Sequence, residues 1–436
     1  MMRRRQFLKA GATLGAGVFI TTNEILGGAR KAPPSDKLDI AIVGVGGRGR
    51  ANTNSVRSEN ITALCDVNDR NLAAAAKRFP KAKTYHDWRK MYDDARAFDA
   101  VVCSTTDHTH AFVSIWAMKL GKHVYCEKPL AHSVYEARMV RKTYLEAKVA
   151  TQMGTQIHAG ANFRRVVELV QSGAIGPVRE AHVWCGRRGP CPRRPAQGMP
   201  VPEYLHWDLW LGPAPFRPYH KSYLPGCMTW EQHWDWGNGC LGDMGSHLID
   251  LPWWALKLRH PLTAQAEGEP RSDESYPHWL KVVWEHPARG DMPPVKLFWY
   301  DGGKKPPPPP DDDLRRWGNG ILFVGDKGYL LADYGRRVLL PKARFKDFQP
   351  PKPWIPASPG HHREWLLGCK TGSPTLCNFD YSGTLIENNL LGTVAFRVGK
   401  KLKWDAENLK AVGCPEADRF IRRKYREGWS LFPPKG

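Results

Sequence analysis

The fold is decided by the stretch LDIAIVGVGGRGRANTNSVRSENITALCDV, which runs from Leu38 to Val67. An apolar strand over residues 38–43 leads into the glycine turn GVGGRG at 44–49, and a short helix and a second apolar strand over 61–64 follow. This order of strand, glycine turn, helix and strand is the dinucleotide-binding fingerprint GxGxxG in its required context. The sequence therefore predicts an α/β domain that binds a dinucleotide, with a glycine turn in another kind of α/β unit as the alternative.

Each residue of the turn has a physical role in this interpretation. Gly44 permits the tight turn, Gly46 lets the backbone approach a pyrophosphate, and Gly49 lets the helix pack closely on the strand. Gly47 and Arg48 open the helix, whose free N–H groups face the phosphates. These five residues are therefore predicted to bind the cofactor.

An acidic residue is expected about twenty positions beyond the first glycine, where it binds the adenosine ribose hydroxyls. Asp66 lies there, directly after the second strand. A 2'-phosphate would meet this carboxylate, so the sequence favours NAD over NADP.

Composition narrows the classes of partner. A chain of 436 residues should form about two domains. The formal net charge is +21, but the basic residues are scattered and form no nucleic-acid-binding module, so no nucleic acid is expected. The ten cysteines form no CxxC pair and the histidines show no HExxH spacing, so no metal is predicted. A disulfide between Cys185 and Cys191, or between Cys227 and Cys240, stays open.

The first residues have the pattern of a targeting segment. Arg3, Arg4 and Arg5 are followed by Gln-Phe-Leu-Lys and by a mildly hydrophobic run over 10–20, which resembles a twin-arginine export signal. We expect residues 1–36 to be signal and linker, the protein to be periplasmic, and no transmembrane segment to follow. An uncleaved basic N-terminus is the alternative. Export in the folded state would let the enzyme carry its nucleotide with it.

Two domains follow from the order of the apolar segments. Apolar runs alternate with helical patterns as far as Gly154, which predicts an NAD-binding Rossmann domain, a doubly wound parallel sheet, over 37–157. The later strands are separated by short turns and predict a C-terminal α+β domain over 158–436 with a large, mostly antiparallel sheet. These strands are expected at 179–185, 281–285, 295–300, 321–324, 329–332 and 337–340.

Further motifs make the chain recognisable. The stretch CSTTDHTHAFVSIWAMKLGKHVYCEKPLA, from Cys103 to Ala131, contains DHTH and EKP. GTQ at 154–156, GCLGDMGSH at 239–247, GDKG at 325–328 and EWL at 364–366 continue the pattern. Over nearly the whole chain after Lys37 these motifs resemble the Gfo/Idh/MocA family, whose members oxidise or reduce sugars with a nicotinamide cofactor.

The resemblance implies a catalytic set of Lys128, Asp243 and His247. Lys128 ends a strand at the carboxyl edge of the parallel sheet, where its ammonium can stabilise a developing alkoxide. Asp243 and His247 are four residues apart, so one helical turn places both on one face, where the carboxylate can orient or charge the imidazole. His247 would then take the hydroxyl proton of a sugar while the nicotinamide receives the hydride. A surface lysine, a helix cap and a packed histidine are the plain alternatives.

The resemblance also implies wider binding sets. The cofactor would contact Thr105, Asp107, His110, Glu127, Lys128 and Gln156. The substrate would contact Lys128, His158, Trp230, Trp236, Asp243 and His247. The two tryptophans come from an aromatic-rich segment over 203–236, most of which is expected to pack in the core. Arg187, Arg188, Arg193 and Arg194 are interpreted as a solvated basic loop, with binding of a carboxylate or sulfate as the alternative. A homo-oligomer is expected to form through the C-terminal sheet.

Two enzymatic functions remain possible. The first is an exported NAD-dependent oxidoreductase that transfers a hydride at a hydroxyl or carbonyl of a sugar or glycoside. The second is a redox-neutral glycoside hydrolase or lyase with tightly bound NAD, which oxidises the sugar transiently, eliminates the aglycone and returns the hydride. A sugar-binding protein without catalysis would not need Lys128, Asp243 and His247.

Overall fold

The computed structural model describes residues 37–434, so the predicted export signal lies outside the described residues. Among the described residues, every helix is too short or too polar to span a membrane. The ten cysteines are free thiols, so neither of the two disulfides left open by the sequence is formed.

The N-terminal sheet has six parallel strands in the order β3-β2-β1-β4-β5-β6. They span Asp39–Val43 (β1), Asn60–Cys65 (β2), Lys83–Tyr85 (β3), Ala100–Cys103 (β4), His123–Cys126 (β5) and Thr151–Met153 (β6). The strand order reverses between β1 and β4, which is where a doubly wound sheet opens a crevice for ligands. The predicted parallel sheet is confirmed, although β3 was not expected because its short KTY sequence carries no apolar run.

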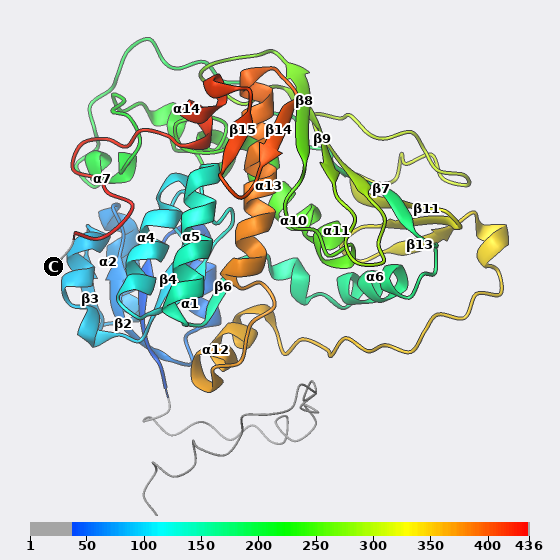
Figure 1. Ribbon diagram of the computed structural model, residues 1–436. Coiled ribbons are helices and arrows are strands. Elements are labelled where there is room, and N and C mark those ends of the chain that lie inside the picture. Colours follow the sequence, from blue (N-terminus) through cyan, green and yellow to red (C-terminus); the bar gives the residue numbers. More distant parts are fainter. Residues whose placement is uncertain (1–36, 435–436) are drawn as a thin grey trace, which may run out of the picture. The chain divides into compact units, whose positions relative to one another are not determined.

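Helices lie between and around the strands (Figure 1). They span Gly47–Ser55 (α1), Asp69–Arg78 (α2), Trp88–Asp93 (α3), Asp107–Lys119 (α4), Val134–Ala147 (α5), Ala161–Gln171 (α6), Trp207–Leu211 (α7), Cys227–Trp230 (α8), Gly239–Asp243 (α9), Gly245–Leu248 (α10), Asp250–Ala255 (α11), His361–Thr371 (α12), Phe379–Val398 (α13) and Asp418–Ile421 (α14).

The side chains of β1 alternate between two hydrophobic cores, as a sheet covered on both faces requires. Val43 lies in the core that contains Phe112 of α4. Ile40 lies in the other core, with Leu72 of α2 and Trp365 of α12. Since α12 comes from far along the chain, residues beyond 157 help to cover the N-terminal sheet.

The second sheet has nine strands in the order β13-β12-β11-β7-β10-β9-β8-β14-β15. They span Val178–Cys185 (β7), Thr263–Glu269 (β8), Trp279–His286 (β9), Val295–Tyr300 (β10), Asn319–Gly325 (β11), Gly328–Ala332 (β12), Arg337–Leu340 (β13), Leu402–Asp405 (β14) and Lys410–Val412 (β15). Neighbours are antiparallel except β7 and β10. The predicted mostly antiparallel sheet is confirmed, with β8, β14 and β15 as additional strands.

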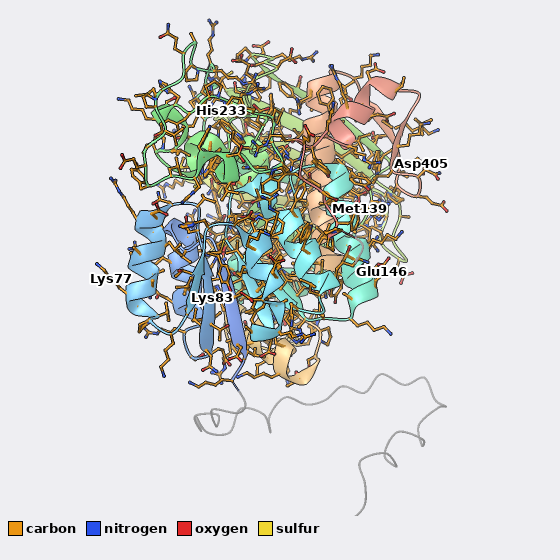
Figure 2. All side chains as sticks on the ribbon, turned by 90° about the vertical axis from the view of Figure 1, so that its left-hand side faces the viewer. Lys77, Lys83, Met139, Glu146, His233 and Asp405 are labelled. Carbon is orange, nitrogen blue, oxygen red and sulfur yellow. The ribbon has the colours of Figure 1, made fainter. Side chains whose placement is uncertain are left out.

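The 20-residue helix α13 connects the two sheets. It contacts α5 of the N-terminal half and β8 of the second sheet, and Figure 1 shows it beside α5. Nearly all of its residues are buried, so its sequence lacks the one-sided apolar stripe that reveals a surface helix. On the outside of the N-terminal half, charged side chains such as Lys77, Lys83 and Glu146 project into solvent (Figure 2).

Candidate active site

The glycine turn has the steric requirements that a dinucleotide loop needs. Gly44 has a φ of +82°, and a Cβ there would lie 2.4 Å from the carbonyl oxygen of Ser104. A Cβ on Gly49 would lie 1.9 Å from the carbonyl oxygen of Gly44. At Gly46 the nearest atoms belong only to the side chain of Asn71. Backbone atoms therefore leave no room for a side chain at Gly44 or Gly49. At Gly46 only the flexible side chain of Asn71 would have to move.

The N-terminus of α1 can accept an anion. Gly46 is its N-cap residue and gives no side-chain hydrogen bond, and the first turn contains no acidic residue. Uncapped N–H groups and the helix dipole together favour a phosphate at this position. Gly47 and Arg48 form this turn, so the loop fits the pyrophosphate of NAD.

Asp66 lies against the glycine turn at the end of β2. Its Oδ2 accepts hydrogen bonds from the backbone N–H groups of Val45 (2.9 Å) and Gly46 (3.2 Å), and its Oδ1 accepts one from Asn68 (2.9 Å). Burial raises the pKa of Asp66, and these hydrogen bonds oppose the rise. The carboxylate is thus held beside the loop, where an adenosine ribose would meet it.

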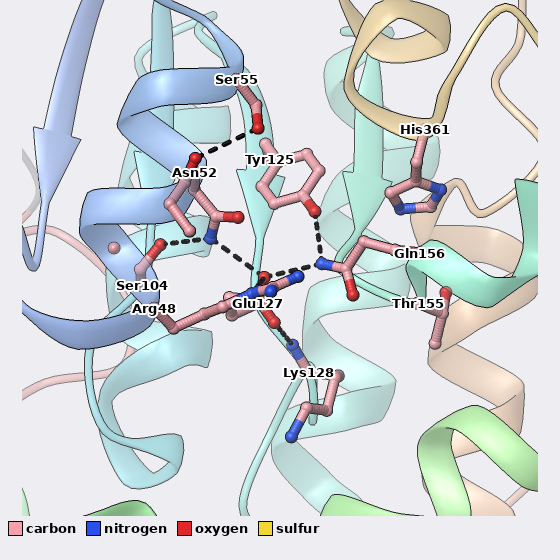
Figure 3. A network of polar contacts seen from close by, with 12 residues as sticks. Arg48, Asn52, Ser55, Ser104, Tyr125, Glu127, Lys128, Thr155, Gln156 and His361 are labelled. Atoms are coloured by element: carbon pink, nitrogen blue, oxygen red, sulfur yellow. Dashed lines mark hydrogen bonds and ion pairs between the residues drawn. The ribbon is translucent and has the colours of Figure 1, made fainter.

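Glu127 is the centre of a polar network at the end of β5. Figure 3 shows Arg48, Asn52 and Gln156 converging on its carboxylate, at 3.1, 2.9 and 2.9 Å. Burial disfavours the charged form, but Arg48 and Asn52 outweigh it and hold the pKa of Glu127 below its usual value. A Cβ on Gly154 would come within 2.7 Å of this carboxylate, so the glycine of the GTQ motif leaves room for Glu127. The network joins α1 to β5 and to the segment after β6.

Lys128 extends from the same strand end into a cluster of charges. Its ammonium donates to Oδ1 of Asp243, and the guanidinium of Arg187 donates to Oδ2. The exposed fractions of the Lys128 and Asp243 side chains are 19% and 8%. Burial opposes the charge on Lys128, but Asp243 more than compensates and raises the pKa of the lysine. Lys128 is therefore an ammonium fixed by a carboxylate at neutral pH.

His247 lies one helical turn beyond Asp243, because the backbone stays helical through Met244 between α9 and α10. Among the described residues the Asp243 carboxylate accepts hydrogen bonds from Lys128 and Arg187, and none joins it to the ring of His247. Nδ1 of His247 is buried without a partner among the described residues. Burial and the charge of Lys128 lower the pKa of His247 to about 4, so its ring is neutral at pH 7.

Two further carboxyl groups lie within electrostatic reach of Lys128 and Asp243. Burial raises the pKa of Asp107 to about 7, with the negative charge of Asp243 adding to the rise. Burial and the charges of Asp243 and Asp107 raise the pKa of Glu231 to about 9. Glu231 is 3% exposed and is protonated at neutral pH.

We expect Glu231→Gln to remove a pH dependence of stability. The folded-state pKa of Glu231 is raised from 4.5 to about 9, so wild-type stability falls as pH rises through this window, by up to about 1.4 kcal/mol per pH unit. Glutamine keeps the shape and the acceptor for Gln232 (3.2 Å) without ionising. In thermal melts at pH 5, 7 and 9, the melting temperature of the variant should rise relative to that of the wild type at each increase in pH. A difference in melting temperature that does not change with pH would contradict the assignment.

Several predicted cofactor residues have structural hydrogen bonds near the crevice. The hydroxyl of Thr105 accepts from the hydroxyl of Thr109 at 2.6 Å. The ring nitrogens of His110 lie 2.7 Å from the carbonyl oxygen of Pro129 and 3.1 Å from that of Thr105. Gln156 donates to Tyr125 at 2.9 Å as well as to Glu127. These bonds brace the loops after β4 and β5.

His158 forms a buried ion pair beside the helix α10 that carries His247. Nδ1 of His158 lies 2.9 Å from Asp250, its ring stacks on Trp254 at 4.0 Å, and it is 1% exposed. Burial disfavours the charged ring, but Asp250 raises the pKa of His158 to about 10. The ion pair accounts for Nδ1 of this histidine, whereas its Nε2 is buried without a partner among the described residues.

The two predicted sugar-binding tryptophans differ in their exposure. Trp236 is 1% exposed and packs edge-on against Trp210 and Tyr223, at 5.1 and 4.7 Å between ring centroids. The ring of Trp236 is therefore enclosed by core residues. Trp230 is partly buried against the same aromatic cluster. Aromatic content alone does not separate core rings from binding rings.

Arg187 and Glu231 were missed by the sequence reasoning. Arg187 was interpreted as part of a solvated loop, but it pairs with Asp243. It follows β7 of a mixed sheet, for which no rule says which strand end carries ligands. Glu231 lies in the aromatic segment with no motif around it. Only the spatial arrangement brings the two to Lys128.

Comparison with known families agrees with this architecture. The family model described as "Oxidoreductase family, NAD-binding Rossmann fold" matches residues 38–155. A second model of the same family, described as "Oxidoreductase family, C-terminal alpha/beta domain", matches residues 180–288. The two matches together cover more than half of the chain.

Curated relatives are similar to this chain over part of their length. Inositol 2-dehydrogenase from Salmonella typhimurium is 29% identical over 151 residues, which is 33% of this chain and 45% of the relative. Myo-inositol 2-dehydrogenase from Thermotoga maritima is 32% identical over 143 residues, 31% of this chain and 42% of the relative. A glycosyl hydrolase family 109 protein from Solibacter usitatus is 30% identical over 195 residues, 40% and 44% of the two chains. The chain thus spans less than half the length of these relatives.

Solved structures share the fold at low sequence identity. The WlbA dehydrogenase from Bordetella pertussis, in complex with NADH and UDP-GlcNAcA, superposes with a TM-score of 0.57 and 18% identity, covering 85% of this chain and 99% of that chain. Levoglucosan dehydrogenase in complex with NADH and levoglucosan gives a TM-score of 0.58 and 15% identity, covering 84% and 98%. From the family models and the glycine turn, the chain belongs to the Gfo/Idh/MocA oxidoreductase family and has its NAD-binding Rossmann fold.

Proposed function

We propose that this protein is an NAD-dependent oxidoreductase that oxidises a hydroxyl group, or reduces the matching carbonyl, of a sugar or glycoside. One observation carries the proposal. The ammonium of Lys128, fixed by Asp243, and the neutral ring of His247 meet at the carboxyl edge of a sheet whose glycine turn fits NAD. Hydride transfer from an alcohol requires such a pair of groups, a cation that stabilises the developing oxyanion and a base that accepts the hydroxyl proton.

Each residue of the site would have a separate role in the reaction. Bound NAD supplies the hydride acceptor. The Lys128 ammonium donates a hydrogen bond to the substrate hydroxyl and stabilises the negative charge that grows on its oxygen. His247 accepts the hydroxyl proton, because its low pKa leaves the ring neutral at pH 7. Asp243 positions Lys128 and Arg187 and keeps both charged.

The test is a panel of sugars and glycosides offered to the purified, NAD-loaded protein. A dehydrogenase should reduce one NAD for each sugar oxidised, followed by NADH absorbance and by analysis of the product. Turnover of a sugar without any change in NAD would contradict net oxidation.

A redox-neutral hydrolase or lyase is the second candidate. The match to a glycosyl hydrolase family 109 protein, over 40% of this chain, favours it. In that reaction the sugar is oxidised transiently, the aglycone leaves by elimination, and the hydride returns, so that NAD is regenerated. Release of the aglycone without added NAD and without accumulated NADH would select this function.

Asp66 should decide between NAD and NADP. Because the carboxylate lies at the loop amides of Val45 and Gly46, it would repel a 2'-phosphate. We expect Asp66→Ser to weaken NAD relative to NADP by about tenfold, the equivalent of one charged hydrogen bond. Titration of both nucleotides, with Asp69→Ser on the adjacent helix as control, gives the ratio. An unchanged ratio would remove Asp66 from the ribose site.

We further propose that the protein is exported folded, with NAD already bound. The support is the arginine run at Arg3, Arg4 and Arg5 before a mildly apolar segment. Replacing the three with lysine should leave a folded, NAD-loaded protein in the cytoplasm, as judged by cell fractionation and nucleotide analysis. Continued appearance of the variant in the periplasm would contradict a twin-arginine signal.

A further inference from the structure

A cavity is formed by residues outside the candidate active site. It has a volume of about 410 Å³ and is lined by the start of α5, by the last turns of α13 and by α14. Its wall includes none of the glycine turn, Lys128, Asp243 or His247. The volume falls in the range of small-molecule sites in proteins.

Two guanidinium groups line this cavity without an ion-pair partner among residues 37–434. Arg397, in the last turn of α13, lies over the rings of Trp234 and Phe420, at 5.0 and 4.2 Å from their centroids. The guanidinium of Arg419 also lies over the ring of Phe420, at 4.5 Å from its centroid. Burial lowers the pKa of Arg397 to about 10, so it stays charged at pH 7. Aromatic stacking holds the planar donors of these side chains in place.

Buried polar groups of the cavity wall also lack partners. The hydroxyl of Thr393, which is 3% exposed, and both ring nitrogens of His132, which is 8% exposed, make no hydrogen bond among the described residues. Nη1 of Arg423 is likewise unpartnered, although Nε of the same side chain is fixed by Glu136 at 2.6 Å. Buried polar atoms in native proteins are rarely left without a partner.

The carboxylates of the cavity wall, Asp235 and Asp273, offset only part of this charge. Asp235 already accepts from Arg194 at 3.0 Å and from Arg217 at 2.8 Å. Asp273 is exposed and forms no ion pair in the described residues. Arg397, Arg419 and Lys424 therefore leave an excess of positive charge for a ligand.

We propose that this cavity is a binding site for a small organic anion of about monosaccharide size, whose carboxylate or phosphate oxygens are bound by Arg397 and Arg419. Arginine is suited to both kinds of oxyanion because its parallel N–H groups donate in pairs. The proposal does not depend on the sugar oxidised at Lys128.

The test is calorimetric titration of the full-length, NAD-loaded protein with glucuronate, with glucose 6-phosphate and with uncharged glucose. We expect glucuronate or glucose 6-phosphate to bind, with the stronger of the two identifying the oxyanion. Arg397→Gln and Arg419→Gln should each weaken that binding about tenfold or more. Lys128→Met, in the candidate active site, should leave it unchanged.

Controls keep the result decisive. Arg419 is exposed, so its glutamine variant tests the site even if Arg397→Gln fails to fold. Arg315→Gln, an exposed arginine paired with Asp313, is the matched surface control and should bind like the wild type. Binding of neither anion, equal binding by the Arg419 variant, or loss of binding in Lys128→Met alone would overturn the proposal. So would a fall in oligomer mass in Arg419→Gln, since the cavity would then face a second copy of the chain.

Discussion

Lys128→Met should lower kcat by about 10²–10³, the usual cost of losing one group that stabilises developing charge in the transition state. Methionine keeps most of the length of the side chain and removes its ammonium. Asp243 would then keep only Arg187 as a partner, and no charge would face the substrate oxygen. NAD affinity should change little, because the glycine turn and Asp66 are untouched. Steady-state kinetics and nucleotide titration measure the two quantities.

The matched control for Lys128→Met is Lys119→Met. Lys119 is an exposed lysine of α4 whose partner is Glu146, at 2.8 Å. Its replacement should leave kcat within about twofold, since exposed ion pairs contribute little. If Lys128→Met keeps wild-type kcat, the ammonium does not act on the substrate oxygen.

Gly49→Ala should abolish tight NAD binding and destabilise the N-terminal half. A Cβ at this position would lie 1.9 Å from the carbonyl oxygen of Gly44 and 3.2 Å from Cβ of Ser104. Neither is the end of a flexible side chain, so α1 must move away from β1. Overpacking of this kind costs about 1–3 kcal/mol, and the displaced helix no longer presents its N–H groups to a pyrophosphate. Thermal melts with and without NAD measure both effects.

Gly335→Ala is the matched control for Gly49→Ala. A Cβ there meets nothing within 4 Å, and its φ is not in the left-handed region. Its melting temperature and NAD affinity should equal those of the wild type. A Gly49→Ala protein that binds NAD normally would show that the turn does not hold the cofactor.

Local sequence patterns determined most of the fold. The strands β1, β2, β4 and β5 are apolar runs that alternate with helical patterns, so their order could be predicted. The helix α13 was not expected because it is buried on all sides and has no polar face. The strand β3 is short and partly exposed, and β14 and β15 join the second sheet from the far end of the chain. Such elements are fixed by tertiary packing rather than by local pattern.

The candidate site was predictable only where motifs mark it. Lys128, Asp243 and His247 stand in recognisable motifs, but Arg187 and Glu231 do not. Pairing with Arg187 also changes the role of Asp243, which was expected to orient His247. Long-range contacts between side chains determine these roles, and spacing along the chain does not report them.

The account is tested most directly by mixing the NAD-loaded protein with a panel of sugars and glycosides and recording NADH absorbance in the first turnover. We predict that at least one compound produces NADH in the wild type. The NADH absorbance should persist if the protein is a dehydrogenase and should disappear again if it is a hydrolase or lyase. Lys128→Met with NAD bound should produce none at a comparable rate. NADH formation by Lys128→Met as fast as by the wild type, or none from any compound with NAD bound, would contradict hydride transfer at this site.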